Sequence, residues 1–119
     1  MTITERRKYQ RVKTQNALSY VCIDDKGTPS EERTGTAMEI SQGGLFMETH
    51  HPLAPQDVLQ ITIDIQGEWV PIKGRVVHCR TDDSGKSRMG IQFLESNEKI
   101  LSFVTSLIKN YSEFITQHG

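Results

Sequence analysis

The chain contains no apolar run close to the roughly 20 residues that a membrane-spanning helix needs. Charged residues are frequent in positions 5–13, where the apolar core of a signal peptide would lie. Cysteine is also scarce: Cys22 and Cys79 are far apart in the sequence, with no Cys-x-x-Cys pair and no pair of histidines nearby. This spacing predicts neither a zinc site nor a disulfide framework. We therefore expect a cytoplasmic protein without membrane insertion, with free thiols and with no bound metal.

A strong charge of either sign is missing as well, since 14 basic and 15 acidic residues give a net charge of −1. This balance argues against a DNA- or RNA-binding protein, which generally carries an excess of positive charge. The charge is nevertheless uneven, because residues 1–13 hold five basic residues and one acidic residue. We interpret residues 1–13 as a flexible basic arm suited to a small anionic ligand or an acidic partner, and residues 14–119 as one domain. A solvated tail is the plain alternative for the arm.

No group of residues indicates catalysis or a cofactor. No serine, histidine and carboxylate can be matched as a nucleophile with its base, and Ser41 has no evident base beside it. The adjacent His50 and His51 precede Pro52 in a loop, and no third metal ligand accompanies them. We therefore expect a binding protein that is not an enzyme and has no cofactor.

Six segments have the short length and the apolar alternation of β-strands, and turns rich in Gly, Pro, Asp and Ser separate them. The clearest is 58–65, where aliphatic residues at every second position point to one face. Gly74 is the expected bend or bulge of the fifth strand, and Trp69, which opens that strand, is expected in the core or at an edge contact. The predicted strands span residues 17–24, 31–40, 45–49, 58–65, 69–80 and 89–93.

The apolar period then changes to spacings of three and four residues, which predicts a helix from about 97 to 115 with Ser96 as its N-cap. Short strands followed by one helix favour a mostly β protein, a six-stranded antiparallel β-barrel whose C-terminal helix covers one open end or side. The apolar stripe of the helix consists of Ile100, Val104, Leu107, Ile108, Tyr111 and Ile115.

Two motifs stand out against this strand pattern. Residues 7–11 form an Arg-x-x-x-Arg run, and residues 39–44 fit an acidic-x-Ser-x-x-Gly pattern. Together with the strand segments at 74–77 and 89–93, they resemble the PilZ domain family over nearly the whole chain. The resemblance implies a split six-stranded antiparallel barrel with a C-terminal helix, and a domain that binds the bacterial second messenger cyclic di-GMP without turnover.

The resemblance also implies which residues bind the nucleotide. Arg7 and Arg11 match the arginine pair, Ser41 and Gly44 match the turn, and Glu39 occupies the acidic position. An arginine fork pairs with phosphate oxygens and with guanine O6 and N7. Guanine N1–H and its amine are donors, so the Glu39 carboxylate and the Ser41 hydroxyl are the expected acceptors.

Three further residues are weaker candidates. Gly43, with its neighbour Gly44, is expected to supply a positive φ angle and to let the ligand approach the backbone closely. Arg6 is a candidate for contacting a second, stacked nucleotide, against the alternative of a surface arginine. His78 lies where some relatives carry a ring that stacks on a base, against the alternative of an ordinary strand histidine.

Signalling is expected to follow from ordering of the arm across the barrel, which a protein partner would sense. One position departs from the family pattern: Asp or Asn is usual where this chain has Glu39, whose carboxylate lies one methylene further out. The alternative function is therefore a degenerate PilZ-like module that acts by protein–protein interaction without binding nucleotide. Whether one nucleotide binds or a stacked pair stays open at this point.

Overall fold

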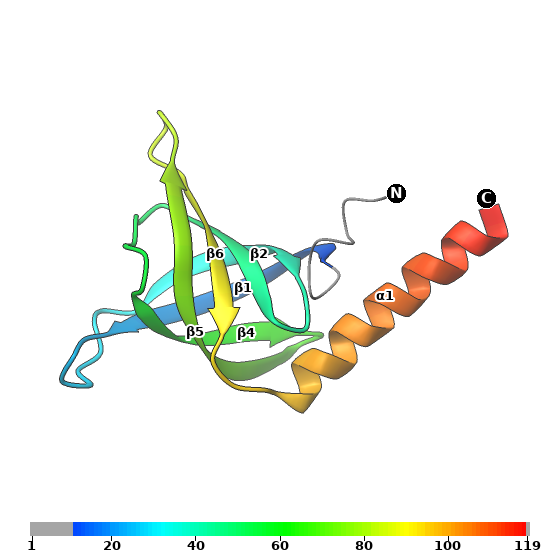
Figure 1. The fold of residues 1–119 in the computed structure, drawn as a ribbon, viewed down its shortest axis with the longest axis horizontal. Coiled ribbons are helices and arrows are strands. Elements are labelled where there is room, and N and C mark those ends of the chain that lie inside the picture. The colour runs from blue at the N-terminus through cyan, green and yellow to red at the C-terminus, as the bar shows by residue number, and fades with distance from the viewer. Residues whose placement is uncertain (1–10, 119) are drawn as a thin grey trace.

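Six antiparallel strands close into a barrel, and one helix follows them (Figure 1). The computed structural model describes the backbone of residues 11–118 and the side chains of residues 11–110. Around the barrel the strands follow the order β1-β2-β3-β6-β5-β4. The elements are β1 (Val12–Ile23), β2 (Arg33–Ile40), β3 (Gly44–Thr49), β4 (Val58–Ile65), β5 (Glu68–Thr81), β6 (Ser87–Phe93) and α1 (Glu98–His118).

This architecture confirms the predicted fold class of a mostly β, six-stranded antiparallel barrel with a C-terminal helix. The first strand begins earlier than expected: β1 includes Val12 and Lys13, which the sequence pattern had assigned to the arm. Residues 1–10, which hold the rest of the expected arm, lie outside the described residues.

Alternation of side chains along the strands builds the core. In β4 every second residue is buried, as the pattern predicted, because successive side chains of a strand point to opposite faces of the sheet. The inward-facing residues of all six strands meet inside the barrel, while the others form its outer surface. The buried apolar side chains of the strands are Leu18, Tyr20, Ala37, Ile40, Leu45, Met47, Leu59, Ile61, Ile63, Ile65, Val70, Ile72, Val76, Met89 and Ile91.

The sequence suggested a bend or bulge of β5 at Gly74, but the bulge lies elsewhere in the strand. Gly74 pairs regularly with Leu59 of β4 and with Phe93 of β6. The register shifts instead between Val76 and His78, so Val77 and His78 both lie opposite a single residue of β6. A bulge of this kind breaks the alternation, and Val77 and His78 are both exposed on the outer face.

The helix α1 extends diagonally from one end of the barrel, and its C-terminal half reaches beyond the strands (Figure 1). Its N-cap is Asn97 and not Ser96, since the Asn97 Oδ1 accepts hydrogen bonds from the backbone N–H of Lys99 (2.9 Å) and of Ile100 (3.2 Å). Ile100 and Val104 are buried, and Leu107 and Ile108 pack against the core. The predicted stripe is thereby confirmed up to residue 108, and its remaining side chains lie outside the described ones.

Trp69 lies outside the core. Its side chain is 57% exposed on the outer face of β5, because it alternates with the buried Val70 and Ile72. Among residues 11–118, no helix has the length and apolarity needed to cross a membrane.

Candidate functional site

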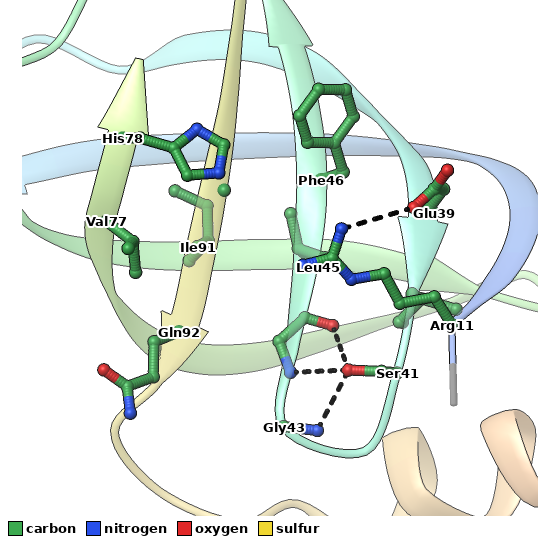
Figure 2. A pocket seen from close by; sticks show the side chains of 13 residues that line it. Arg11, Glu39, Ser41, Gly43, Leu45, Phe46, Val77, His78, Ile91 and Gln92 are labelled. Atoms are coloured by element: carbon green, nitrogen blue, oxygen red, sulfur yellow. Dashed lines mark hydrogen bonds and ion pairs between the residues drawn. The ribbon is translucent and has the colours of Figure 1, made fainter. Parts of the chain in front are cut away.

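A cavity of about 480 Å³ lies on the outer face of the barrel, across β2, β3, β6 and β5 (Figure 2). Six residues singled out from the sequence line it, and they come from three separate stretches of the chain. Arg7 and Arg6 lie outside the described residues. The six predicted residues in the cavity wall are Arg11, Glu39, Ser41, Gly43, Gly44 and His78.

The strand register explains how distant residues meet in this wall. Glu39 of β2 lies opposite Phe46 of β3, Phe46 lies opposite Gly90 of β6, and Gly90 lies opposite His78 of β5. These four residues therefore form one row across four adjacent strands. Phe46 alternates with the buried Leu45 and Met47 and so lies on the outer surface. Glu39 and His78 each follow a register shift in their strand, and both lie on the same surface. Arg11 reaches the same row from the residue just before β1.

Arg11 and Glu39 form an ion pair at the edge of the cavity. The Arg11 Nη1 lies 3.7 Å from the Glu39 Oε1 (Figure 2). Both side chains are partly exposed, and an ion pair in such a position contributes only about 0–1 kcal/mol. A ligand that offers either group a better partner can therefore replace the pair at little cost.

The turn at 41–44 is organised by the Ser41 side chain. Its Oγ accepts hydrogen bonds from the backbone N–H of Gly43 (3.2 Å) and of Gly44 (3.1 Å), and donates to the Gly44 carbonyl oxygen (3.2 Å). The Ser41 N–H donates to the same carbonyl at 2.8 Å. The hydroxyl therefore forms hydrogen bonds within the turn, and its expected role as an acceptor for guanine stays a prediction.

Gly43 and Gly44 also differ from expectation, since neither has a positive φ angle. Gly44 is needed for another reason: a Cβ at position 44 would lie 2.1 Å from the carbonyl oxygen of Ile91 in β6. The Gly43 carbonyl accepts a hydrogen bond from the Phe93 N–H at 2.9 Å. Close packing of the turn and β3 against β6 therefore requires a bare backbone at position 44.

The ring of His78 lies over Gly90. A Cβ at position 90 would be 2.7 Å from the His78 Nε2, so only glycine leaves room for the ring in this position. The centroids of the His78 and Phe46 rings are 6.4 Å apart, with planes tilted by 46°, within the range of aromatic pairing. These two rings and the glycine between them give the cavity one apolar, flat-sided wall.

The family model described as PilZ domain matches residues 5–109. The chain belongs to the PilZ domain family. The match spans all six strands and the first turns of α1, including the turn at 41–44 and the Arg-x-x-x-Arg run.

Solved structures with the same fold include other proteins that contain PilZ domains. The chain is similar to the inhibitor of motility MotI/DgrA of Bacillus subtilis, with a TM-score of 0.72 and 18% identity over 91% of this chain and 52% of that one. It is similar to the PilZ domain of YcgR from Escherichia coli, solved with c-di-GMP, with a TM-score of 0.64 and 14% identity over 93% of this chain and 98% of that one.

A third similar structure is the MrkH–c-di-GMP complex of K. pneumonia, with a TM-score of 0.66 and 15% identity over 96% of this chain and 55% of that one. The chain therefore spans about half the length of MotI/DgrA and of MrkH. At identities this low, the structural similarity establishes the shared fold. The comparison with curated proteins gave no match.

The PilZ cavity of this chain also contains residues that the sequence analysis missed. Phe46, Val77 and Gln92 line it. Phe46 follows from the alternation of β3, because it lies between the buried Leu45 and Met47. Val77 carries no such signal, since it reaches the outer face only through the bulge. Gln92 lies opposite Gly44, a pairing between strands that are far apart in the sequence. Among residues 11–110, no group of three or more His, Cys, Asp or Glu side chains is placed to hold a metal ion.

Proposed function

We propose that this PilZ domain is a non-catalytic receptor for cyclic di-GMP, and that the nucleotide binds in the cavity beside the turn at 41–44. The observation that carries the proposal is the convergence of Arg11, Glu39, the turn and His78 on one cavity wall. Membership of the PilZ family supports it, as do the similar folds of YcgR and MrkH, both solved with c-di-GMP.

The charges at the cavity edge suit this ligand. The Arg11 guanidinium pairs with a phosphate or with guanine O6 and N7, which are its ordinary partners in nucleic acids. The Glu39 carboxylate accepts from guanine N1–H and the exocyclic amine, two donors that adenine does not present on that edge. Each group leaves the Arg11–Glu39 pair for a more complementary partner.

The remaining residues shape the site. Ser41 and Gly44 act through the backbone of the turn, which they hold close to β6, and Gly43 keeps the approach to that backbone open. The rings of His78 and Phe46 offer a surface on which a guanine base stacks, an interaction worth about 1–3 kcal/mol per base. Arg7 completes the arginine pair from outside the described residues, and Arg6 is the candidate for a second nucleotide.

Output is proposed to run through the basic segment before β1. Nucleotide binding orders this segment against the barrel, and a cytoplasmic protein partner senses the change. The reciprocal consequence is that partner binding raises nucleotide affinity by the same factor.

Calorimetric titration with cyclic di-GMP tests the proposal, with GTP and cyclic di-AMP as comparison ligands. We expect saturable, selective binding, and we expect Arg11→Ala to weaken it about 10-fold or more by removing a charge-assisted contact. Arg88→Ala is the matched control, because Arg88 is an exposed arginine paired with Glu48 and Asp82 outside the cavity. Its affinity should match that of the parent chain. The stoichiometry distinguishes one nucleotide from a stacked pair.

The second candidate is a nucleotide-independent interaction module. The Arg11–Glu39 ion pair favours it, since the longer carboxylate already satisfies the arginine that a nucleotide would use. Absence of binding heat, with no gain on Glu39→Asp, would support this module over the receptor. Nucleotide binding by the parent chain excludes it.

A further inference from the structure

Every large apolar side chain that is exposed among residues 11–110 lies on or beside one strand. Trp69 is 57% exposed, Val77 51% and Leu94 37%. Trp69 and Val77 belong to β5, and the Leu94 N–H donates to the Lys73 carbonyl of β5 at 2.9 Å. We call the outer face of this strand the β5 strip, which consists of Trp69, Pro71, Lys73, Arg75, Val77 and the adjoining Leu94.

We propose that the β5 strip is a docking surface for a helix of a partner protein, one that carries apolar side chains flanked by carboxylates. Tryptophan is the residue type most enriched among the side chains that dominate protein–protein binding. Apolar side chains that are exposed together on one face of a folded domain are candidates for an interaction site. Trp69 and Pro71 at one end of the strip, Leu94 beside Lys73, and Val77 at the other end supply the apolar part of the surface.

The partner helix is expected to carry carboxylates because Lys73 and Arg75 lie between the apolar ends of the strip. Neither forms an ion pair with any side chain that the structure describes, whereas Arg88 and Lys86 on the neighbouring strand and hairpin both pair with Glu48. Two cations with no ion-pair partner among the described side chains, set among exposed apolar groups, complement carboxylates on a partner.

The partner cannot bind the β5 strip by adding a strand beside Trp69 to Arg75. On one side these residues are paired with β4, and Val76 is hydrogen-bonded to Gln56 and Asp57. On the other side β5 is paired with β6 from Gly74 onward. Before Gly74 that second side is blocked, because Pro71 has no N–H and its carbonyl accepts from the Asn97 Nδ2 at 3.3 Å. Contact must therefore run through side chains. From Trp69 to Val77 the strip is about 26 Å long at a rise of about 3.3 Å per residue, which corresponds to a helix of about 17 residues.

The strip ends at the candidate nucleotide site. Val77 lines the cavity, and Arg75 lies opposite Gln92, which also lines it. A helix on the strip would therefore contact the cavity wall and sense its occupancy. This role as an output surface rests on the proposed receptor function, whereas docking itself does not.

Photo-crosslinking in the native cell tests the docking surface. The full chain carries p-benzoylphenylalanine in place of Trp69, or in place of Thr105, an exposed position on α1, as the matched site control. We expect a specific crosslink from position 69 alone, to a peptide of another protein that is apolar and acidic. Lys73→Glu should reduce the crosslink about 10-fold, while Lys109→Glu, at an exposed position on α1, should not. Replacing the partner's carboxylate by lysine should restore the crosslink with Lys73→Glu.

Four results would overturn the docking proposal: no crosslink from position 69 above that from position 105, a crosslink to a second copy of this chain, a captured peptide without carboxylates, or insensitivity to Lys73→Glu. Cyclic di-GMP titration of Trp69→Ala separates this failure from failure of the receptor function. Trp69 does not line the cavity. The affinity of the Trp69→Ala variant for cyclic di-GMP should therefore stay within about 2-fold of that of the parent chain, whatever the crosslinking shows.

Discussion

The hydroxyl group of Ser41 makes three hydrogen bonds within a turn of four residues, two as acceptor and one as donor. Only a small side chain with both functions can hold the N–H groups of Gly43 and Gly44 and the Gly44 carbonyl together. Ser41 is also largely buried, so water does not easily replace these bonds. A residue that the motif marks as a ligand contact therefore stabilises the turn on which the contacts depend.

Ser41→Ala is expected to lower the free energy of unfolding by about 1–2 kcal/mol, because it leaves two backbone N–H groups without their partner. Urea denaturation measures the loss. Ser106→Ala is the control, since Ser106 is exposed on α1 and alanine there should change stability by less than about 0.5 kcal/mol. Equal stability of the two variants would mean that the hydroxyl contributes little to the turn.

The site residues were predictable from the sequence where they belong to a short local motif. Spacing within 39–44 predicted the turn, and the structure brings this turn, Arg11 and His78 together in the wall of one cavity. The role of the Ser41 hydroxyl was not predictable, because the sequence does not show whether it points into the turn or into the cavity. The contacts of Gln92 depend on pairing between β3 and β6, which no local pattern encodes.

At the scale of elements, a close backbone approach near the site joins β3 to β6. Gly44 starts β3, and its Cα hydrogen faces the Ile91 carbonyl at a distance that excludes a methyl group. The turn, the start of β3 and the end of β6 are therefore one packed unit, tied again by the hydrogen bond from the Phe93 N–H to the Gly43 carbonyl. Any side chain at position 44 has to separate these elements.

Gly44→Ala should destabilise the fold by about 3 kcal/mol, the upper range for overpacking a close contact, and should weaken nucleotide binding by displacing the turn. Thermal denaturation and calorimetry measure the two effects. Gly67→Ala serves as the control. Gly67 has a φ angle of 89° with no atom near the position of an added Cβ, so the only expected cost of this substitution is backbone strain of about 1–2 kcal/mol. A smaller loss at position 44 than at 67 would contradict the packing argument.

Strand positions were predictable because burial on one face imposes a period of two, as in β4, where the pattern and the structure coincide. The bulge of β5 was not. Gly74 is the residue whose conformational freedom suggests a bulge, yet the register shift falls at Val77, a residue type typical of regular strand. What decides the position is the fit of β5 to β6 beside Gly90, and that fit involves two strands at once.

At the scale of the whole molecule, Tyr20 joins the barrel wall to its interior. Its hydroxyl lies 3.1 Å from the Thr49 Oγ1, and the Thr49 hydroxyl donates to the Thr34 carbonyl at 3.0 Å. Since the single hydroxyl proton of Thr49 is used in that bond, Tyr20 must be the donor to Thr49. One partly buried chain of hydrogen bonds thus links β1, β3 and β2, and it requires Tyr20 in its neutral form.

Global stability should therefore fall at alkaline pH. Burial raises the pKa of the Tyr20 hydroxyl above its ordinary value of 10.0. Burial, with the nearby Asp57 carboxylate, likewise raises the pKa of the Cys22 thiol above 9.0. For each acid the folded state holds its proton more tightly than the unfolded chain does. The resulting stabilisation is complete below the pKa of the group in the unfolded chain. It is lost as the pH rises from that value through the higher pKa of the folded state.

Urea denaturation between pH 8 and pH 11 should show the free energy of unfolding decreasing from about pH 9 upward, through the Cys22 and Tyr20 ranges in turn. Tyr20→Phe should cost about 1 kcal/mol at neutral pH, through loss of the hydrogen bond to Thr49. The same variant should decline less steeply above pH 10, because phenylalanine has no proton to lose, while the contribution of Cys22 remains. Parallel pH profiles for Tyr20→Phe and the parent chain would show that ionisation of Tyr20 does not limit the stability of the barrel.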